Sequence, residues 1–134
     1  MIDFLKAKKL LIDDITLVLV KGDQVITSEK RGISFLLSLA CENKYQGYSA
    51  ADKIVGKAAA FLYVIMQVEN VYGETITKRA VEILRQANIN VEYKILTENI
   101  INRTNTGLCP MELIVLNIED KEEAFMALKK KINE

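Results

Sequence analysis

The segment from 52 to 68 reads DKIVGKAAAFLYVIMQV and contains the longest uncharged apolar run of the chain, Ala58 to Met66. A helix drawn through this run is apolar on nearly every side, and such helices are normally buried. We therefore expect a helix from about Asp52 to Val68 at the centre of the domain, covered on several sides. The run is much shorter than the roughly 20 residues of a membrane-spanning helix, and we expect no association with a membrane.

The segments on both sides of this helix show alternating helix and strand patterns. Those before it predict an amphipathic helix at 2–12, a hairpin of strands at 15–20 and 24–27, a helix at 33–43 and a short strand at 48–50. Those after it predict a strand at 70–72, a helix at 77–87 that Thr75 or Thr77 could cap, a strand at 91–96, and helices at 110–117 and 121–132, the last starting after Asp120. This order favours one α/β domain over residues 1–134, a three-layer α/β/α arrangement with a five-stranded mixed sheet.

Composition excludes several classes of function. The 134 residues include 18 basic and 18 acidic side chains, no histidine and two cysteines, Cys41 and Cys109. A balanced charge is not the footprint of a nucleic-acid-binding protein. Histidine is the commonest general base and transition-metal ligand, and the two cysteines form neither a zinc motif nor a disulfide framework. We expect a cytoplasmic protein with reduced thiols, no metal, no cofactor and no nucleic-acid partner, and a Cys41 that lies in the core.

The start of the predicted central helix is the first candidate site. Ser49 or Asp52 could cap it, and Lys53 and Lys57 would lie one turn apart on the same face. Each lysine there opposes the helix dipole at a cost of about 0.3–1 kcal/mol, which favours a bound phosphate or carboxylate at the helix start. The alternative is that both lysines reach solvent or pair with nearby acids. Gly56, inside the predicted helix, suggests close approach of another element, or of a ligand.

The segment from 102 to 112, NRTNTGLCPME, is the second candidate site and holds the only proline. Pro110 suits the first position of a helix, which makes Cys109 the N-cap and places Glu112 at the third position, as in a capping box. A thiol at a helix start is activated by the oriented amides. Cys109 is therefore a candidate nucleophile, with Glu112, Asp52 or a lysine as its base; alternatively it packs as a small buried side chain.

The loop before Cys109 supplies polar groups that suit an anion, although an ordinary polar loop has the same composition. The candidate ligand-binding residues in it are Asn102, Arg103, Thr104, Thr106 and Gly107. The guanidinium of Arg103 favours bidentate recognition of an oxyanion, and Gly107 allows the positive φ of an anion-binding turn. Since ligands of such sheets bind beyond the carboxyl ends of parallel strands, we expect the two segments to form one site.

Together, the motif at 52–60 and the motif Asn102-Arg103-(x)3-Gly107-x-Cys109-Pro110-Met111-Glu112 resemble an uncharacterised bacterial and archaeal family with a cytidine-deaminase-like fold. The resemblance covers nearly the whole chain and implies that fold, but no assigned activity. Zinc deaminases carry a His or Cys with a catalytic Glu at one helix start and Pro-Cys-x-x-Cys at the next. The corresponding positions here, near 51–53 and 77–80, lack the zinc ligands.

Three functions remain open from the sequence. The first is a metal-free pocket for a small anionic, nucleotide-like ligand, bound by Lys53, Lys57, Asn102 and Arg103. The second is a thiol-dependent enzyme or sulfur carrier that uses Cys109. The third is a regulatory protein-interaction module. The sequence also leaves a homodimer open.

Overall fold

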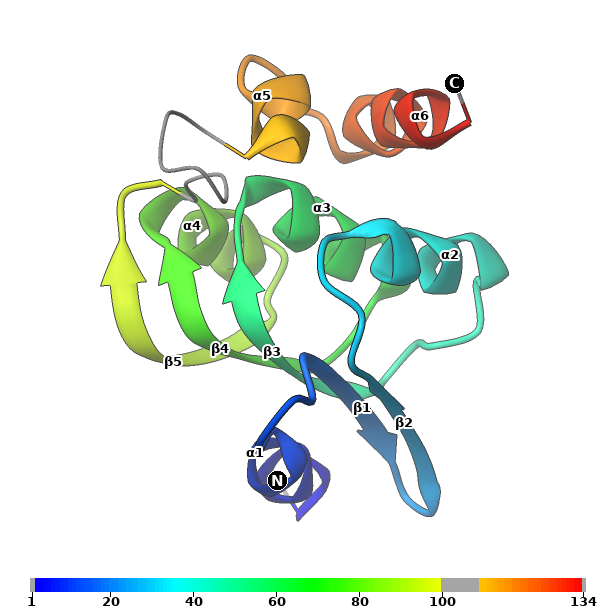
Figure 1. The fold of residues 1–134 in the computed structure, drawn as a ribbon, viewed down its shortest axis with the longest axis vertical. Coiled ribbons are helices and arrows are strands. Elements are labelled where there is room, and N and C mark those ends of the chain that lie inside the picture. The colour runs from blue at the N-terminus through cyan, green and yellow to red at the C-terminus, as the bar shows by residue number, and fades with distance from the viewer. Residues whose placement is uncertain (1, 100–108, 134) are drawn as a thin grey trace.

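A computed structural model of the chain describes residues 2–99 and 109–133, which form an α/β domain (Figure 1). The first half contains α1 (Ile2–Leu10), β1 (Leu17–Lys21), β2 (Gln24–Ser28), α2 (Ser34–Glu42), β3 (Ser49–Val55) and α3 (Lys57–Met66). The second half contains β4 (Asn70–Thr77), α4 (Lys78–Gln86), β5 (Asn90–Thr97), α5 (Pro110–Val115) and α6 (Lys121–Ile132). No helix in this described part is long and apolar enough to cross a bilayer.

The strands form one mixed sheet in the order β2-β1-β3-β4-β5. β1 is antiparallel to both β2 and β3, whereas β3, β4 and β5 run parallel. The expected α/β class, with a hairpin first and parallel crossovers later, is therefore confirmed. The crossovers bring the carboxyl ends of β3, β4 and β5 to one edge of the domain, beside the starts of α3 and α4 (Figure 1).

The helices cover the two faces of the sheet unequally. Among the described helices, only α1 packs on one face, over a small cluster that includes Val18, Val20 and Ala51. α2, α3 and α4 lie on the other face, and α5 and α6 pack against α3 from outside (Figure 1). α3 is consequently buried over nearly its whole length, from Lys57 to Tyr63 and again at Met66. The apolar run predicted this central position correctly.

The boundary between β3 and α3 differs from the expectation. The strand continues to Val55, and Gly56 is the N-cap of the helix, so the helix predicted from Asp52 to Val68 is too long at its start. The reason is pairing on both sides: Asp52 is opposite Leu17 of β1, and Ile54 and Val55 are opposite residues of β4. These ladder hydrogen bonds outweigh the helical preference of the local sequence. Consequently neither Ser49 nor Asp52 caps α3, and Gly56 is not inside it.

Three other helix starts agree with the sequence. The Thr77 side chain accepts a hydrogen bond from the amide of Ala80 and caps α4. The Asp120 carboxylate accepts from the amide of Glu123 and caps α6. Cys109 is the N-cap of α5, with Pro110 at the first helical position. These caps depend on residues within one turn of the helix, which is why they could be predicted locally.

Candidate functional site

A cavity of about 1010 Å³ is lined both by the β3–α3 junction and by residues 109–112, the described part of the second candidate segment. It lies between the β1–β2 hairpin, the end of β3 and the starts of α2, α3 and α5. Its wall is largely apolar, with Leu17, Ile33, Leu36, Ala58 and Met111 among the lining residues. Four of the sequence-predicted site residues also line it, namely Asp52, Lys53, Cys109 and Glu112.

Asp52 is held at the cavity wall by a buried tyrosine. Its Oδ2 accepts a hydrogen bond of 2.6 Å from the Tyr63 hydroxyl, and its Oδ1 accepts one of 3.2 Å from the Ile54 amide. Burial raises the pKa of the Asp52 carboxyl to about 6, against the opposing effect of the hydrogen bonds from Tyr63, Ile54 and Lys53. Burial and the nearby Asp52 charge raise the pKa of Tyr63 well above its usual value. Asp52 can therefore gain or lose a proton in mildly acidic solution.

Lys53 and Lys57 have different surroundings. Lys53 lies on β3, lines the large cavity and donates a hydrogen bond from Nζ to the carbonyl oxygen of Asp13. Lys57 is the first residue of α3 and is only 8% exposed; its Nζ donates to the Leu116 carbonyl at 3.0 Å and to Glu119 Oε2 at 2.7 Å. It lines a separate cavity of about 210 Å³. The expectation that both lysines share one helical face is wrong, because Lys53 belongs to the strand.

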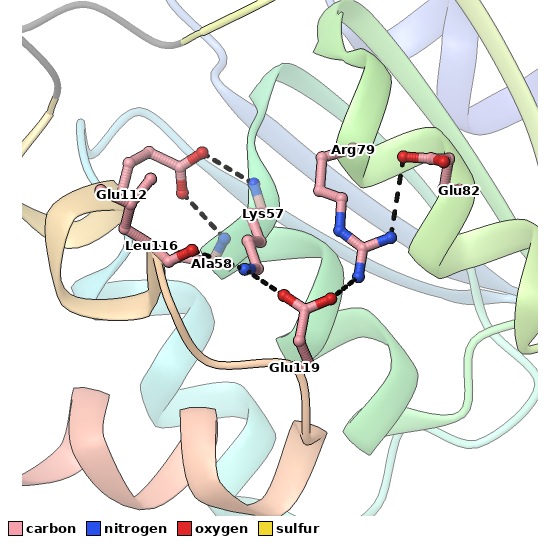
Figure 2. A network of polar contacts seen from close by, with 7 residues as sticks. All are labelled: Lys57, Ala58, Arg79, Glu82, Glu112, Leu116 and Glu119. Carbon is pink, nitrogen blue, oxygen red and sulfur yellow. Dashed lines mark hydrogen bonds and ion pairs between the residues drawn. The ribbon is translucent and has the colours of Figure 1, made fainter.

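The anion at the start of α3 is the carboxylate of Glu112 (Figure 2). Its Oε1 accepts from the Lys57 amide and its Oε2 from the Ala58 amide, both at 2.8 Å. A Cβ on Gly56 would lie 2.2 Å from Oε1, so only glycine leaves room for this carboxylate. The prediction that another element closely approaches Gly56 is confirmed, and that element is α5, which carries Glu112. The capping role predicted for Glu112 at its own helix is wrong, because its side chain caps α3 instead.

A network of charges next to Glu112 ties α3 and α4 to the segment between α5 and α6 (Figure 2). Glu119 accepts hydrogen bonds from Lys57 and from Arg79, and Arg79 also pairs with Glu82 at 3.6 Å. The hydrogen bond from Lys57, together with the charge of Lys57 and Arg79, lowers the pKa of the Glu119 carboxyl. These contacts satisfy the buried ammonium of Lys57 within the protein. Lys57 therefore lines the small cavity and is not among the residues that line the large one.

The remaining predicted residues fall into two groups. Cys109 is partly exposed, not disulfide-bonded, makes no capping bond with its side chain and lines the large cavity. Asn102, Arg103, Thr104, Thr106 and Gly107 lie outside the described residues. Cys41 is exposed rather than in the core, since it lies near the end of α2 on the solvent side. Over residues 2–99 and 109–133, no group of three His, Cys, Asp or Glu side chains could hold a metal ion.

Three residues of the site were not anticipated. Lys30 and Arg31, which follow β2, line the cavity and add positive charge to it. Their position between a strand and Gly32 was a signal of a polar loop before a helix. Tyr63 was also missed, although a hydroxyl inside an apolar helix requires a hydrogen-bond partner. Its partner could not be identified locally, because strand pairing determines where Asp52 lies.

Comparisons with known proteins match nearly the whole chain to one family. The family model of a domain of unknown function, DUF1893, matches residues 6–132. The crystal structure of a DUF1893 family protein (TM1506) from Thermotoga maritima superposes with a TM-score of 0.88, covering 96% of this chain and 89% of that one. The two are 24% identical, so the likeness concerns the fold. No functionally curated protein matches. On the match over residues 6–132, the chain belongs to the DUF1893 family of domains of unknown function.

Proposed function

We propose that the chain binds a small anionic, nucleotide-like molecule in the large cavity without a metal ion. The observation that carries this proposal is the composition of the cavity wall. Apolar side chains from β1, α2, α3 and α5 lie beside three cations, Lys30, Arg31 and Lys53. An apolar surface with a few placed charged groups is typical of small-molecule sites. A ligand with an apolar or planar part and an anionic group matches both features.

Two of the four acids that line the cavity are already hydrogen-bonded within the protein. Glu112 is occupied by the two amides of α3, and Asp52 by Tyr63 and the Ile54 amide. The raised pKa of Asp52, about 6, means that part of this carboxyl is protonated in mildly acidic solution, whereas it is largely ionised at neutral pH. Asp14 and Glu29 are the other acids of the wall.

The size of the cavity favours a ligand as large as a nucleotide. Ligand sites in proteins usually have volumes of roughly 300–1,000 Å³, and this cavity, at about 1010 Å³, lies at the upper end. A single phosphate or acetate ion would leave most of the apolar wall in contact with water. The hydrophobic contribution to binding therefore favours a larger molecule.

Titration calorimetry against nucleoside phosphates and other phosphorylated metabolites tests this function. We expect at least one of them to bind in the presence of EDTA, with an affinity that decreases as salt is added. Lys53→Glu and Arg31→Glu should each weaken binding at least about tenfold, because each replaces an attractive charge beside the anion with a repulsive one.

Lys6→Glu is the matched control, since Lys6 is exposed on α1, on the opposite face of the sheet. It makes the same change of charge and should leave the affinity unaltered. Equal weakening by all three variants would mean that only the net charge matters, and would contradict a site in the cavity. Binding that is lost when EDTA is added would contradict the metal-free mode.

A second candidate function is thiol chemistry at Cys109, which the position of this residue in the cavity wall favours. In a Cys41→Ser background, which removes the other exposed thiol, we expect iodoacetamide to alkylate Cys109 faster than free cysteine at neutral pH. Mass spectrometry over time gives the rate. A rate equal to or below that of free cysteine would leave Cys109 a structural residue.

We also propose that the domain has a cytidine-deaminase-like fold. It is supported by the order of elements and by the motifs at 52–60 and 102–112. The starts of α3 and α4 carry Gly56-Lys57 and Thr77-Lys78, where zinc deaminases carry their ligands. We infer that any related ligand is bound here by side-chain charges and the apolar wall, not by zinc.

A further inference from the structure

We propose that two copies of the chain associate through their β5 strands, which pair antiparallel about Tyr93 and join the two sheets into one. β5 is an edge of the sheet, with β4 on its only paired side in the described residues (Figure 1). The proposal concerns a surface that is separate from the residues lining the large cavity, and it stands independently of the ligand.

The side chains and backbone of β5 are suited to pairing. Tyr93 is 40% exposed, Ile95 51% and Leu96 40%, so this edge strand carries three large apolar side chains in contact with solvent. The Asn90 amide donates to the Glu69 carbonyl just before β4, so the backbone groups of Asn90 face inward. The backbone N–H and C=O groups of successive residues point toward opposite edges of a strand, so the backbone groups of Val91 and Tyr93 face the open edge. In a pair centred on Tyr93, the two Tyr93 residues would exchange their backbone hydrogen bonds.

Charge selects this register over its neighbours. With the two Tyr93 residues opposite each other, Glu92 lies opposite the partner's Lys94, and Lys94 lies opposite the partner's Glu92. Centring the pair on Glu92 or on Lys94 would instead place two like charges opposite each other, which destabilises an antiparallel pair. Residues two apart project from the same face, so the two attractive pairs form on one side of the joined sheet. An ion pair with Lys8 of α1 also orients Glu92, with 2.7 Å between Lys8 Nζ and Glu92 Oε1.

The other edge strand lacks such a pattern. β2 has the sequence QVITS and no charged residue, so no register is favoured by charge there. A lysine in an edge strand normally discourages pairing with other chains. In β5, Glu92 lies two residues before Lys94. Lys94 therefore favours one partner, a second copy of this strand whose Glu92 lies opposite it.

Light scattering coupled to size-exclusion chromatography tests the dimer with a charge swap. The wild-type chain should elute with twice the 15.1 kDa mass of one chain. Lys94→Glu and Glu92→Lys should each give a monomer, because each places like charges opposite each other twice. Mixing these two variants should produce a heterodimer, and the double variant Glu92→Lys/Lys94→Glu should be a dimer again.

Lys8→Gln is the matched control, because it removes the intramolecular partner of Glu92 without changing the edge; it should remain a dimer. Circular dichroism on each variant confirms that the monomers are folded. A wild-type monomer at high micromolar concentration would overturn the proposal, as would a dimer that either single substitution leaves intact. Two monomeric variants that do not associate when mixed would also refute this register.

Discussion

Replacing Gly56 with alanine should lower the free energy of unfolding by about 2–4 kcal/mol. The added Cβ would lie 2.2 Å from Oε1 and 2.6 Å from Cδ of Glu112. Either the carboxylate leaves the amides of Lys57 and Ala58, or the β3–α3 junction moves. The backbone itself is not the cause, because Gly56 has φ −103° and ψ −171°, an extended conformation that alanine adopts without strain. Urea denaturation of the two proteins measures the difference.

A double-mutant cycle with Glu112 separates this contact from other effects. Glu112→Ala alone should cost about 2–3 kcal/mol, since two buried amides lose a charged acceptor. In that background Gly56→Ala should cost much less, because the new methyl group occupies space that the carboxylate has left. Glu112→Gln, which keeps one acceptor but no charge, should lie between. Strictly additive costs would show that Gly56 and Glu112 act independently and would contradict the steric argument.

The second large effect is a dependence of stability on pH that arises from Asp52. Its pKa is about 6 in the folded chain against 3.8 as the ordinary value, so the folded state holds more protons between these two pH values. Stability from this group is therefore greatest at low pH and falls as the pH rises from about 4 to about 6, by up to about 3 kcal/mol. This is opposite in sign to the usual behaviour of an aspartate with a cationic partner.

Asp52→Asn should abolish this component, so the stability of the variant relative to wild type should rise between pH 4 and pH 7. Tyr63→Phe is the complementary variant. It removes the hydrogen bond that favours the charged carboxylate, so the pKa of Asp52 should rise further and the falling part of the curve should extend above pH 6. Urea denaturation across this range measures both. Parallel curves for wild type and Asp52→Asn would show that Asp52 does not titrate as proposed.

Both predictions concern contacts that could be predicted only in part from the sequence. The sequence identified Gly56, Glu112 and Asp52 as unusual, and it predicted correctly that the two segments carrying them lie near each other. It assigned Glu112 to its own helix and Asp52 to the first turn of α3. In the structure Glu112 caps α3 and Asp52 lies in β3. The candidate residues were therefore found, while their partners were not.

The sequence by itself determined the α/β class, the order of the elements, the buried central helix and the helix starts after Cys109 and Asp120, and it limited the cap of α4 to Thr75 or Thr77. These features depend on apolar periodicity and on side chains within one helical turn, and both are legible along the chain. Only the tertiary structure decided where β3 ends and which cavity each lysine lines. It also decided that Glu112 binds the amide of Lys57, a residue 55 positions away. The physical reason is that strand pairing and helix packing bring distant residues together, and their hydrogen bonds outweigh local preference.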